Sequence, residues 1–298
     1  MGGAPSRLNA QLFFHTETGA LRPLWRILLF LIASLGAYVV ADAILGPIIT
    51  RMLGAVGLRG VATQSWITAA ALVGGTIASQ HWIDHRPWRD VWLDRDAARA
   101  PVLVFGFGVG TLAVSIPILS LIAAHWLRLE TGAEGSLIGA AVRVSIFLLP
   151  AALFEELLTR GYILSVLRES WGWPASVVAT SVGFGMLHLA NPGATIQSVV
   201  LVTLAGLFLS GVLYATKSLY AAWMAHFAWN WAMAVLFHTA VSGIPLESPR
   251  YRYVDAGPDW ATGGEWGPEG GLPAGLGMGA GIVYLFAWRG RESRRQET

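Results

Sequence analysis

The sequence predicts an all-α membrane protein, a polytopic bundle of about eight transmembrane helices. Hydrophobic residues make up 54% of the 298 residues and charged residues only 13%, about half the charged fraction of a typical soluble domain. Long apolar stretches recur along the chain, without the period-two alternation that a membrane β-barrel needs. Helices are therefore expected, because a lipid-exposed segment must satisfy its own backbone hydrogen bonds.

Eight apolar segments approach or exceed the length of about 20 residues that a bilayer-spanning helix needs. They are residues 27–49, 61–83, 101–126, 137–167, 174–190, 195–215, 219–238 and 273–288. The fourth is long and is expected to extend into water at one end, whereas the fifth and eighth are short. We therefore predict one membrane domain, residues 24–290, between an N-terminal tail of residues 1–23 and a basic tail of residues 291–298.

The distribution of basic residues predicts the orientation of these segments. With both termini in the cytoplasm, 14 arginine or lysine residues fall inside and 5 fall outside. Because positive residues favour the cytoplasmic side, we predict an integral protein of the cell membrane with cytoplasmic N- and C-termini. The longest loop, residues 239–271, then lies outside, and its Gly and Pro content predicts irregular structure.

Composition also narrows the partners and cofactors. The chain has no cysteine, which excludes disulfides and thiolate metal sites. Its net charge is only +2, and the arginines flank apolar segments instead of forming a basic patch, so we expect membrane lipids as partners and no nucleic acid.

Charged side chains within apolar segments mark candidate functional sites, because Asp or Arg costs about 2.5–3.5 kcal/mol at the centre of a membrane helix. The first group is Glu155, Glu156 and Arg160, in the fourth segment. Glu156 and Arg160 are four residues apart and can pair on one helix face. Glu155 points about 100° away and is free to act as a general base. The alternative is that these residues form the wet end of a helix.

Two further groups lie in the fifth and seventh segments. Phe184 and His188 share a helix face, and a buried histidine can share a proton with a carboxylate, bind a metal or simply bond a neighbouring carbonyl. His226 and Asn230 are also four residues apart. Their N–H groups suit an oxyanion hole, although such side chains also bond neighbouring membrane helices.

Helical rise predicts that these groups lie close to one level. Counted from the cytoplasmic ends of the segments, Glu155, His188 and Asn230 lie about 16–21 Å deep and His226 about 10 Å deep. We therefore expect a carboxylate, imidazoles and an amide around one cavity that opens toward the cytoplasm.

In this order on membrane helices, Glu-Glu-x-x-x-Arg, Phe-x-x-x-His and His-x-x-x-Asn resemble the motifs of the CPBP family. This family comprises the CAAX-protease and bacteriocin-processing proteins, also called Abi, and includes the Ras-converting CAAX prenyl endopeptidase. All three motifs are complete between residues 155 and 230. The resemblance implies an eight-helix intramembrane protease that cuts a hydrophobic or lipidated peptide. The implied roles are activation of water for Glu155 and His188, oxyanion stabilisation for His226 and Asn230, and support of the site for Glu156 and Arg160.

The family is described both as metalloproteases and as glutamate-dependent enzymes without a metal. The sequence lacks a His-Glu-x-x-His helix, but two histidines and a carboxylate can hold catalytic zinc. That set would be His188 and His226 with Glu156 or Glu155. We favour the mechanism without a cofactor, because Arg160 competes with a metal for Glu156.

Other functions compatible with the sequence are non-proteolytic. Intramembrane Glu, His and Arg could form the proton relay of a transporter, although no inverted repeat is evident, or the chain could be an immunity factor. Gly106 and Gly110 predict close helix packing, which would also permit a homo-oligomer.

Overall fold

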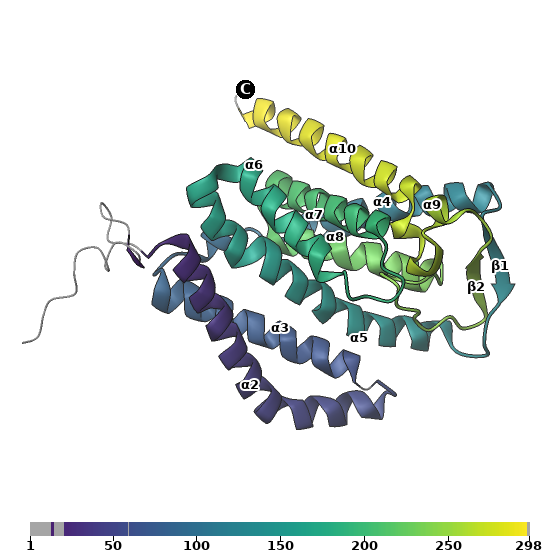
Figure 1. Cartoon of the computed structure of the whole chain (residues 1–298), viewed down its shortest axis with the longest axis horizontal. Coiled ribbons are helices and arrows are strands. Elements are labelled where there is room, and N and C mark those ends of the chain that lie inside the picture. The colour runs from purple at the N-terminus through teal and green to yellow at the C-terminus, as the bar shows by residue number, and fades with distance from the viewer. Residues whose placement is uncertain (1–12, 15–20, 59, 297–298) are drawn as a thin grey trace, which may run out of the picture.

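The computed structural model describes residues 13–14, 21–58 and 60–296. Helices occupy all eight apolar segments, and most run along the long axis of the molecule (Figure 1). Within the described residues, five helical stretches, one of them the run from Leu137 to Leu187, are long and apolar enough to cross a membrane. The larger number stays a prediction. The helices are α2 (Pro23–Ala55), α3 (Val61–Ala78), α4 (Ala100–Ala123), α5 (Leu137–Glu156), α6 (Tyr162–Leu187), α7 (Ile196–Thr216), α8 (Leu219–Trp231) and α10 (Leu272–Gln296).

The predicted tails are described only in part. Residues 1–12 and 15–20 of the N-terminal tail, and residues 297–298 at the other end, lie outside the described residues. The basic tail predicted from residue 291 continues α10 as far as Gln296.

The run from α5 into α6 changes direction at two places. A π-helical turn, η3 (Leu157–Gly161), separates the two helices, directly after the Glu155–Glu156 pair. Gly172 then adopts φ 71° and ψ 174°, a conformation that is essentially restricted to glycine. This kink separates the fourth and fifth predicted segments, in agreement with the break expected between residues 167 and 174.

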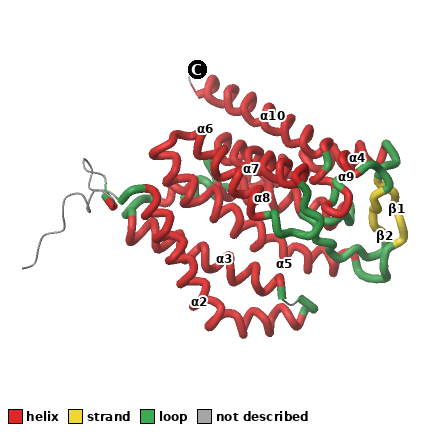
Figure 2. Tube along the Cα trace, viewed as in Figure 1, coloured by secondary structure: helices red, strands yellow, loops and turns green. Residues whose placement is uncertain are grey.

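The connection between α8 and α10 contains regular structure, so the expectation of an irregular loop was wrong in part. Its strand β2 (Tyr251–Asp255) pairs antiparallel with β1 (Leu127–Thr131), which follows α4. Figure 2 shows this strand pair at one end of the helical bundle. The sequence concealed the pairing because each strand has only five residues, and the partners are more than 100 positions apart. The rest of the connection forms short helices, α9 (Asp259–Thr262), η5 (Gly264–Trp266) and η6 (Pro268–Gly270).

Helices α4 and α8 approach each other closely because α4 carries glycines at the contact. A Cβ atom on Gly106 would lie 2.3 Å from the carbonyl oxygen of Ala221, and one on Gly110 would lie 2.1 Å from that of Ala225. Both glycines are therefore used within one chain, where they position α8, the helix that carries His226.

An ionic network joins α2, the connection that follows α3, and α6. Arg26 lies 2.6 Å from Asp84 and 2.7 Å from Glu169, and the Tyr162 hydroxyl donates to Asp84 at 2.8 Å. Arg86 also pairs with Glu169. The Asp84 and Glu169 carboxylates are therefore both paired with arginines.

Candidate active site

Glu156 lies at the centre of a buried polar cluster and is fully buried. Its Oε1 accepts a hydrogen bond from Arg160 Nη1 at 3.0 Å and lies 2.9 Å from His226 Nδ1. Because Oε1 already accepts from Arg160, we assign the proton of the second bond to His226 Nδ1. Glu156 therefore joins α5 to α8 and fixes the orientation of the His226 ring.

Glu155 presents an oxygen to two imidazoles without bonding either directly. Its Oε2 is buried and has no hydrogen-bond partner among the described residues. It lies 3.9 Å from His188 Nε2 and 3.7 Å from His226 Nε2. These distances exceed a direct hydrogen bond and suit bridging through one small polar group, such as a water molecule.

The second ring nitrogen of His188 fixes its orientation in the same way. His188 Nδ1 lies 2.8 Å from the carbonyl oxygen of Phe184, and a carbonyl can only accept, so Nδ1 carries the proton. A bond to a neighbouring carbonyl and a role beside a carboxylate are therefore compatible for His188. Nδ1 bonds the helix backbone, and Nε2 is free to accept a proton beside Glu155.

Arg160 supplies the buried positive charge of the cluster. It is fully buried, its guanidinium lies 4.2 Å from the centre of the Phe184 ring, and its Nη1 also contacts Thr159 Oγ1 at 2.8 Å. A Cβ atom on Gly206 would lie 3.0 Å from Arg160 Nη2, so this glycine leaves room for the guanidinium. If the carboxyl groups of Glu155 and Glu156 are both ionised, Arg160 and a protonated His226 would balance their charge, which avoids the cost of an uncompensated buried ion.

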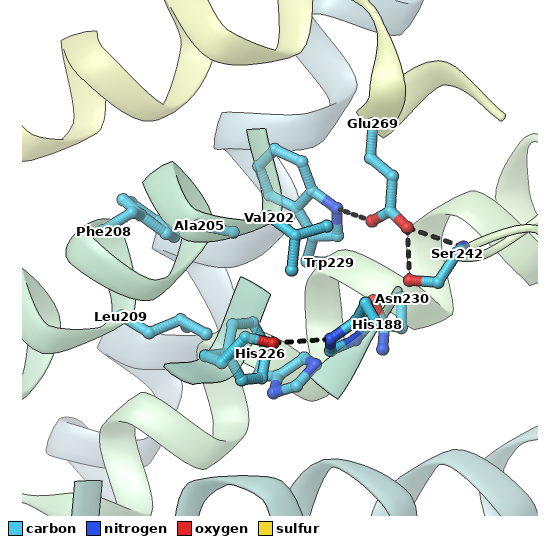
Figure 3. Close-up of a pocket in the computed structure, with 11 residues that line it drawn as sticks. His188, Val202, Ala205, Phe208, Leu209, His226, Trp229, Asn230, Ser242 and Glu269 are labelled. Atoms are coloured by element: carbon cyan, nitrogen blue, oxygen red, sulfur yellow. Dashed lines mark hydrogen bonds between the residues drawn. The ribbon is translucent and has the colours of Figure 1, made fainter. Parts of the chain in front are cut away.

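A cavity borders the two histidines and contains the sixth predicted residue, Asn230 (Figure 3). Asn230 and His226 line it from α8, whereas His188 lines it from the end of α6. Its other walls combine apolar side chains with a few polar groups. The remaining lining residues are Phe184, Val202, Ala205, Phe208, Leu209, Trp229, Ser242 and Glu269.

The six residues predicted from the three motifs thus meet in one place. Contacts of 2.9–3.9 Å join Glu155, Glu156, His188 and His226, Arg160 bonds Glu156, and Asn230 lines the adjacent cavity.

Comparison with known families covers the helices that carry these residues. Residues 137–232 match the family model described as type II CAAX prenyl endopeptidase Rce1-like. The match includes all three motifs and confirms the resemblance predicted from them. No curated protein and no solved structure matches the chain.

Residues outside the matched segment 137–232 cover the cavity. The sequence analysis did not predict this cover. Glu269 Oε1 accepts from the backbone N–H and the hydroxyl of Ser242, each at 2.6 Å. Its Oε2 accepts from Trp229 Nε1 at 3.0 Å, and Trp266 is fully buried next to His188. The sequence does contain one signal of this packing: Trp266 is a large apolar side chain within a glycine-rich loop.

The cover of the cavity belongs to the long connection between α8 and α10. Ser242 and Glu269 belong to the connection of residues 239–271, at the end of the bundle that the charge count assigns to the outside. Helix α6 stops at Leu187, which places His188, another lining residue, at the helix terminus. The direction in which the cavity opens, expected to be cytoplasmic, stays a prediction.

The zinc set that uses Glu156 does not fit this geometry. Glu156 Oε1 is already bonded by Arg160 and by Nδ1 of His226, whereas His188 faces Glu155. The described residues contain no group of three His, Asp or Glu side chains placed to hold a metal ion. The Glu156–His188–His226 set therefore does not converge.

Proposed function

We propose that the chain is an intramembrane endopeptidase that hydrolyses a peptide bond of a membrane-associated or lipidated peptide. The observation that carries this proposal is the placement of Glu155 Oε2 between His188 Nε2 and His226 Nε2. A carboxylate and imidazoles around one small space are the groups that general acid–base catalysis of water attack requires. The match of residues 137–232 to Rce1-like proteins supports the same class of reaction.

Glu155 is the base in this mechanism, and His188 orients the water. A water molecule between them donates one hydrogen to Glu155 Oε2 and the other to His188 Nε2, since neither atom carries a proton. Attack on the scissile carbonyl transfers one proton to Glu155. Glu155 then returns that proton to the leaving amine, which completes the hydrolysis and regenerates the carboxylate.

His226 and Asn230 stabilise the oxyanion that forms during attack. His226 keeps a proton on Nδ1 through its bond to Glu156, and the neutral charge count of the cluster favours a second proton on Nε2. That Nε2–H and the Asn230 amide are then two donors on one face of α8, as an oxyanion hole requires. Glu156 and Arg160 act through His226 and are positioning residues.

We propose that this mechanism uses no metal, because Glu156 Oε1 is bonded to Arg160 and His226 and Glu155 is the base. The apolar walls of the cavity, which include Val202 and Phe208, support a hydrophobic substrate segment. From the distribution of basic residues we also propose cytoplasmic N- and C-termini.

A proteomic comparison tests the function and identifies the substrate. Membranes from cells that produce the wild-type chain are compared with membranes containing Glu155→Gln, for new peptide termini. We expect termini that appear only with the wild type, near the membrane boundary of their parent proteins. An identical set of termini in both samples, together with solute flux in vesicles that Glu155→Gln abolishes, would instead favour a transporter.

A further inference from the structure

Three cations gather around two aromatic rings, away from the candidate active site. Arg168 lies on α6, Lys217 directly follows α7 and Arg289 lies on α10. Lys217 Nζ is 4.4 Å from the centre of the Tyr214 ring and 5.2 Å from that of Trp173. Arg289 contacts the same Tyr214 ring at 4.7 Å, and Arg168 contacts the Trp173 ring at 5.9 Å. The cations therefore form one cluster, which we call the basic cluster.

The basic cluster has no carboxylate to balance it among the side chains that the structure describes. None of the salt bridges between described side chains involves Arg168, Lys217 or Arg289. Glu169, the acidic neighbour of Arg168, is bonded to Arg26 and pairs with Arg86. Arg289 does donate to the carbonyl oxygens at the end of α7, which carry only a partial negative charge.

The ionisation of Lys217 reflects this imbalance. Partial burial, together with repulsion from Arg289 and Arg168, lowers the pKa of Lys217 to about 8. Both charged groups that act on it are cations, and the Tyr214 and Trp173 rings complete its surroundings. An anion placed among the three cations would reverse the repulsion and restore the Lys217 charge.

We propose that the basic cluster, formed by Arg168, Lys217 and Arg289, binds the phosphate of an anionic phospholipid headgroup. Helix α7 is a candidate membrane span that ends at Thr216, so Lys217 lies where headgroups are expected. Tyr214 and Trp173 belong to the aromatic residues that collect at this interface, and nearby Trp171 and Phe286 are each 56% exposed. Lipid chains can cover these apolar side chains, whereas a free phosphate ion cannot.

Lipid binding by the whole purified protein tests the proposal. The detergent-solubilised chain is titrated with phosphatidylglycerol or phosphatidylcholine, and bound lipid is counted by native mass spectrometry. We expect the wild type to retain phosphatidylglycerol in preference to phosphatidylcholine. Removal of one charge by Lys217→Gln should weaken phosphatidylglycerol binding about five-fold, and Arg168→Gln/Lys217→Gln should weaken it about 25-fold.

Matched variants separate a specific site from general surface charge. Arg89→Gln and Arg89→Gln/Arg95→Gln remove the same charge from exposed positions in the α3–α4 connection and should leave binding unchanged. Lys217→Arg keeps the charge at the same backbone conformation, φ 55°, and should bind like the wild type. Equal losses in the Arg89/Arg95 and Arg168/Lys217 double variants would overturn the proposal, as would an unchanged affinity in Arg168→Gln/Lys217→Gln.

Two further measurements distinguish the source of the phosphate and use the ionisation of Lys217. Phosphatidylglycerol affinity should fall between pH 7 and pH 10 in the wild type, because Lys217 loses its proton, and should stay constant in Lys217→Arg. Inorganic phosphate should compete only weakly. Full displacement of the lipid by millimolar inorganic phosphate would show a free-phosphate site and overturn the lipid assignment. None of these readouts requires proteolytic activity.

Discussion

The buried Glu156–Arg160 pair offers a quantitative test of how the site is held together. Both side chains are 0% exposed and lie 3.0 Å apart. Arg160→Met keeps much of the side-chain volume against Phe184 but leaves the Glu156 carboxylate, among the described residues, bonded only to His226. Removing one partner of a buried pair costs about 3–5 kcal/mol, because the other charge is left uncompensated.

The double variant separates this coupling from unrelated packing effects. We expect Arg160→Met and Glu156→Gln each to lower the free energy of unfolding by about 3–5 kcal/mol, and the double variant to lose less than the sum of the two. Reversible unfolding by sodium dodecyl sulfate in mixed micelles measures all four proteins. A double variant whose loss equals the sum, within about 0.5 kcal/mol, would refute the claim that the pair acts as a unit.

Three other predictions follow from contacts at and near the site. Gly110→Ala should destabilise the protein by about 1–3 kcal/mol, because the new methyl group meets the Ala225 carbonyl. Gly108→Ala is the control, because a Cβ atom there meets open space, and it should not destabilise the protein. Equal unfolding curves for the two variants would contradict this packing. Asn230→Ala should lower kcat about 10²–10³-fold with a small change in KM, as loss of an oxyanion donor does, and an unchanged kcat would remove Asn230 from that role. Dialysis against a chelator should leave proteolysis unchanged, because Glu156 is committed to Arg160 and His226; activity that is lost and then restored by zinc would overturn the metal-free mechanism.

Helical spacing predicted the parts of the site that lie within one helix. The pairs Glu156–Arg160 and His226–Asn230 depend on a separation of four residues, which periodicity reveals directly. The break near Gly172 was also visible, since Gly and Pro interrupt the apolar pattern there.

Contacts between elements could not be deduced from spacing. The bond from His226 to Glu156 joins residues 70 positions apart, and it depends on the approach of α8 to α5 and on the π-helical turn after Glu156. No periodic signal encodes such a turn. The loop over the cavity was missed for a similar reason, because Glu269 is buried by contacts with Ser242 and Trp229 rather than by a hydrophobic pattern of its own.

One boundary used in the depth estimate differs from the structure, although the groups meet as that estimate predicted. The fifth segment was expected to continue as helix through residue 190, whereas α6 ends at Leu187. His188 therefore lies at a helix terminus under the loop, even though its distance from Glu155 is close enough for the proposed chemistry.

The central claim is that Glu155 activates a water molecule that attacks the peptide bond directly. The most direct test is a single turnover of the purified protein in H₂¹⁸O, with a substrate from the proteomic comparison, followed by mass spectrometry of the products and of the peptide containing Glu155. The mechanism predicts one ¹⁸O atom in the new carboxylate of the product, none in Glu155, and no cleavage by Glu155→Gln. Incorporation of ¹⁸O into Glu155, or cleavage by Glu155→Gln at the wild-type rate, would contradict it.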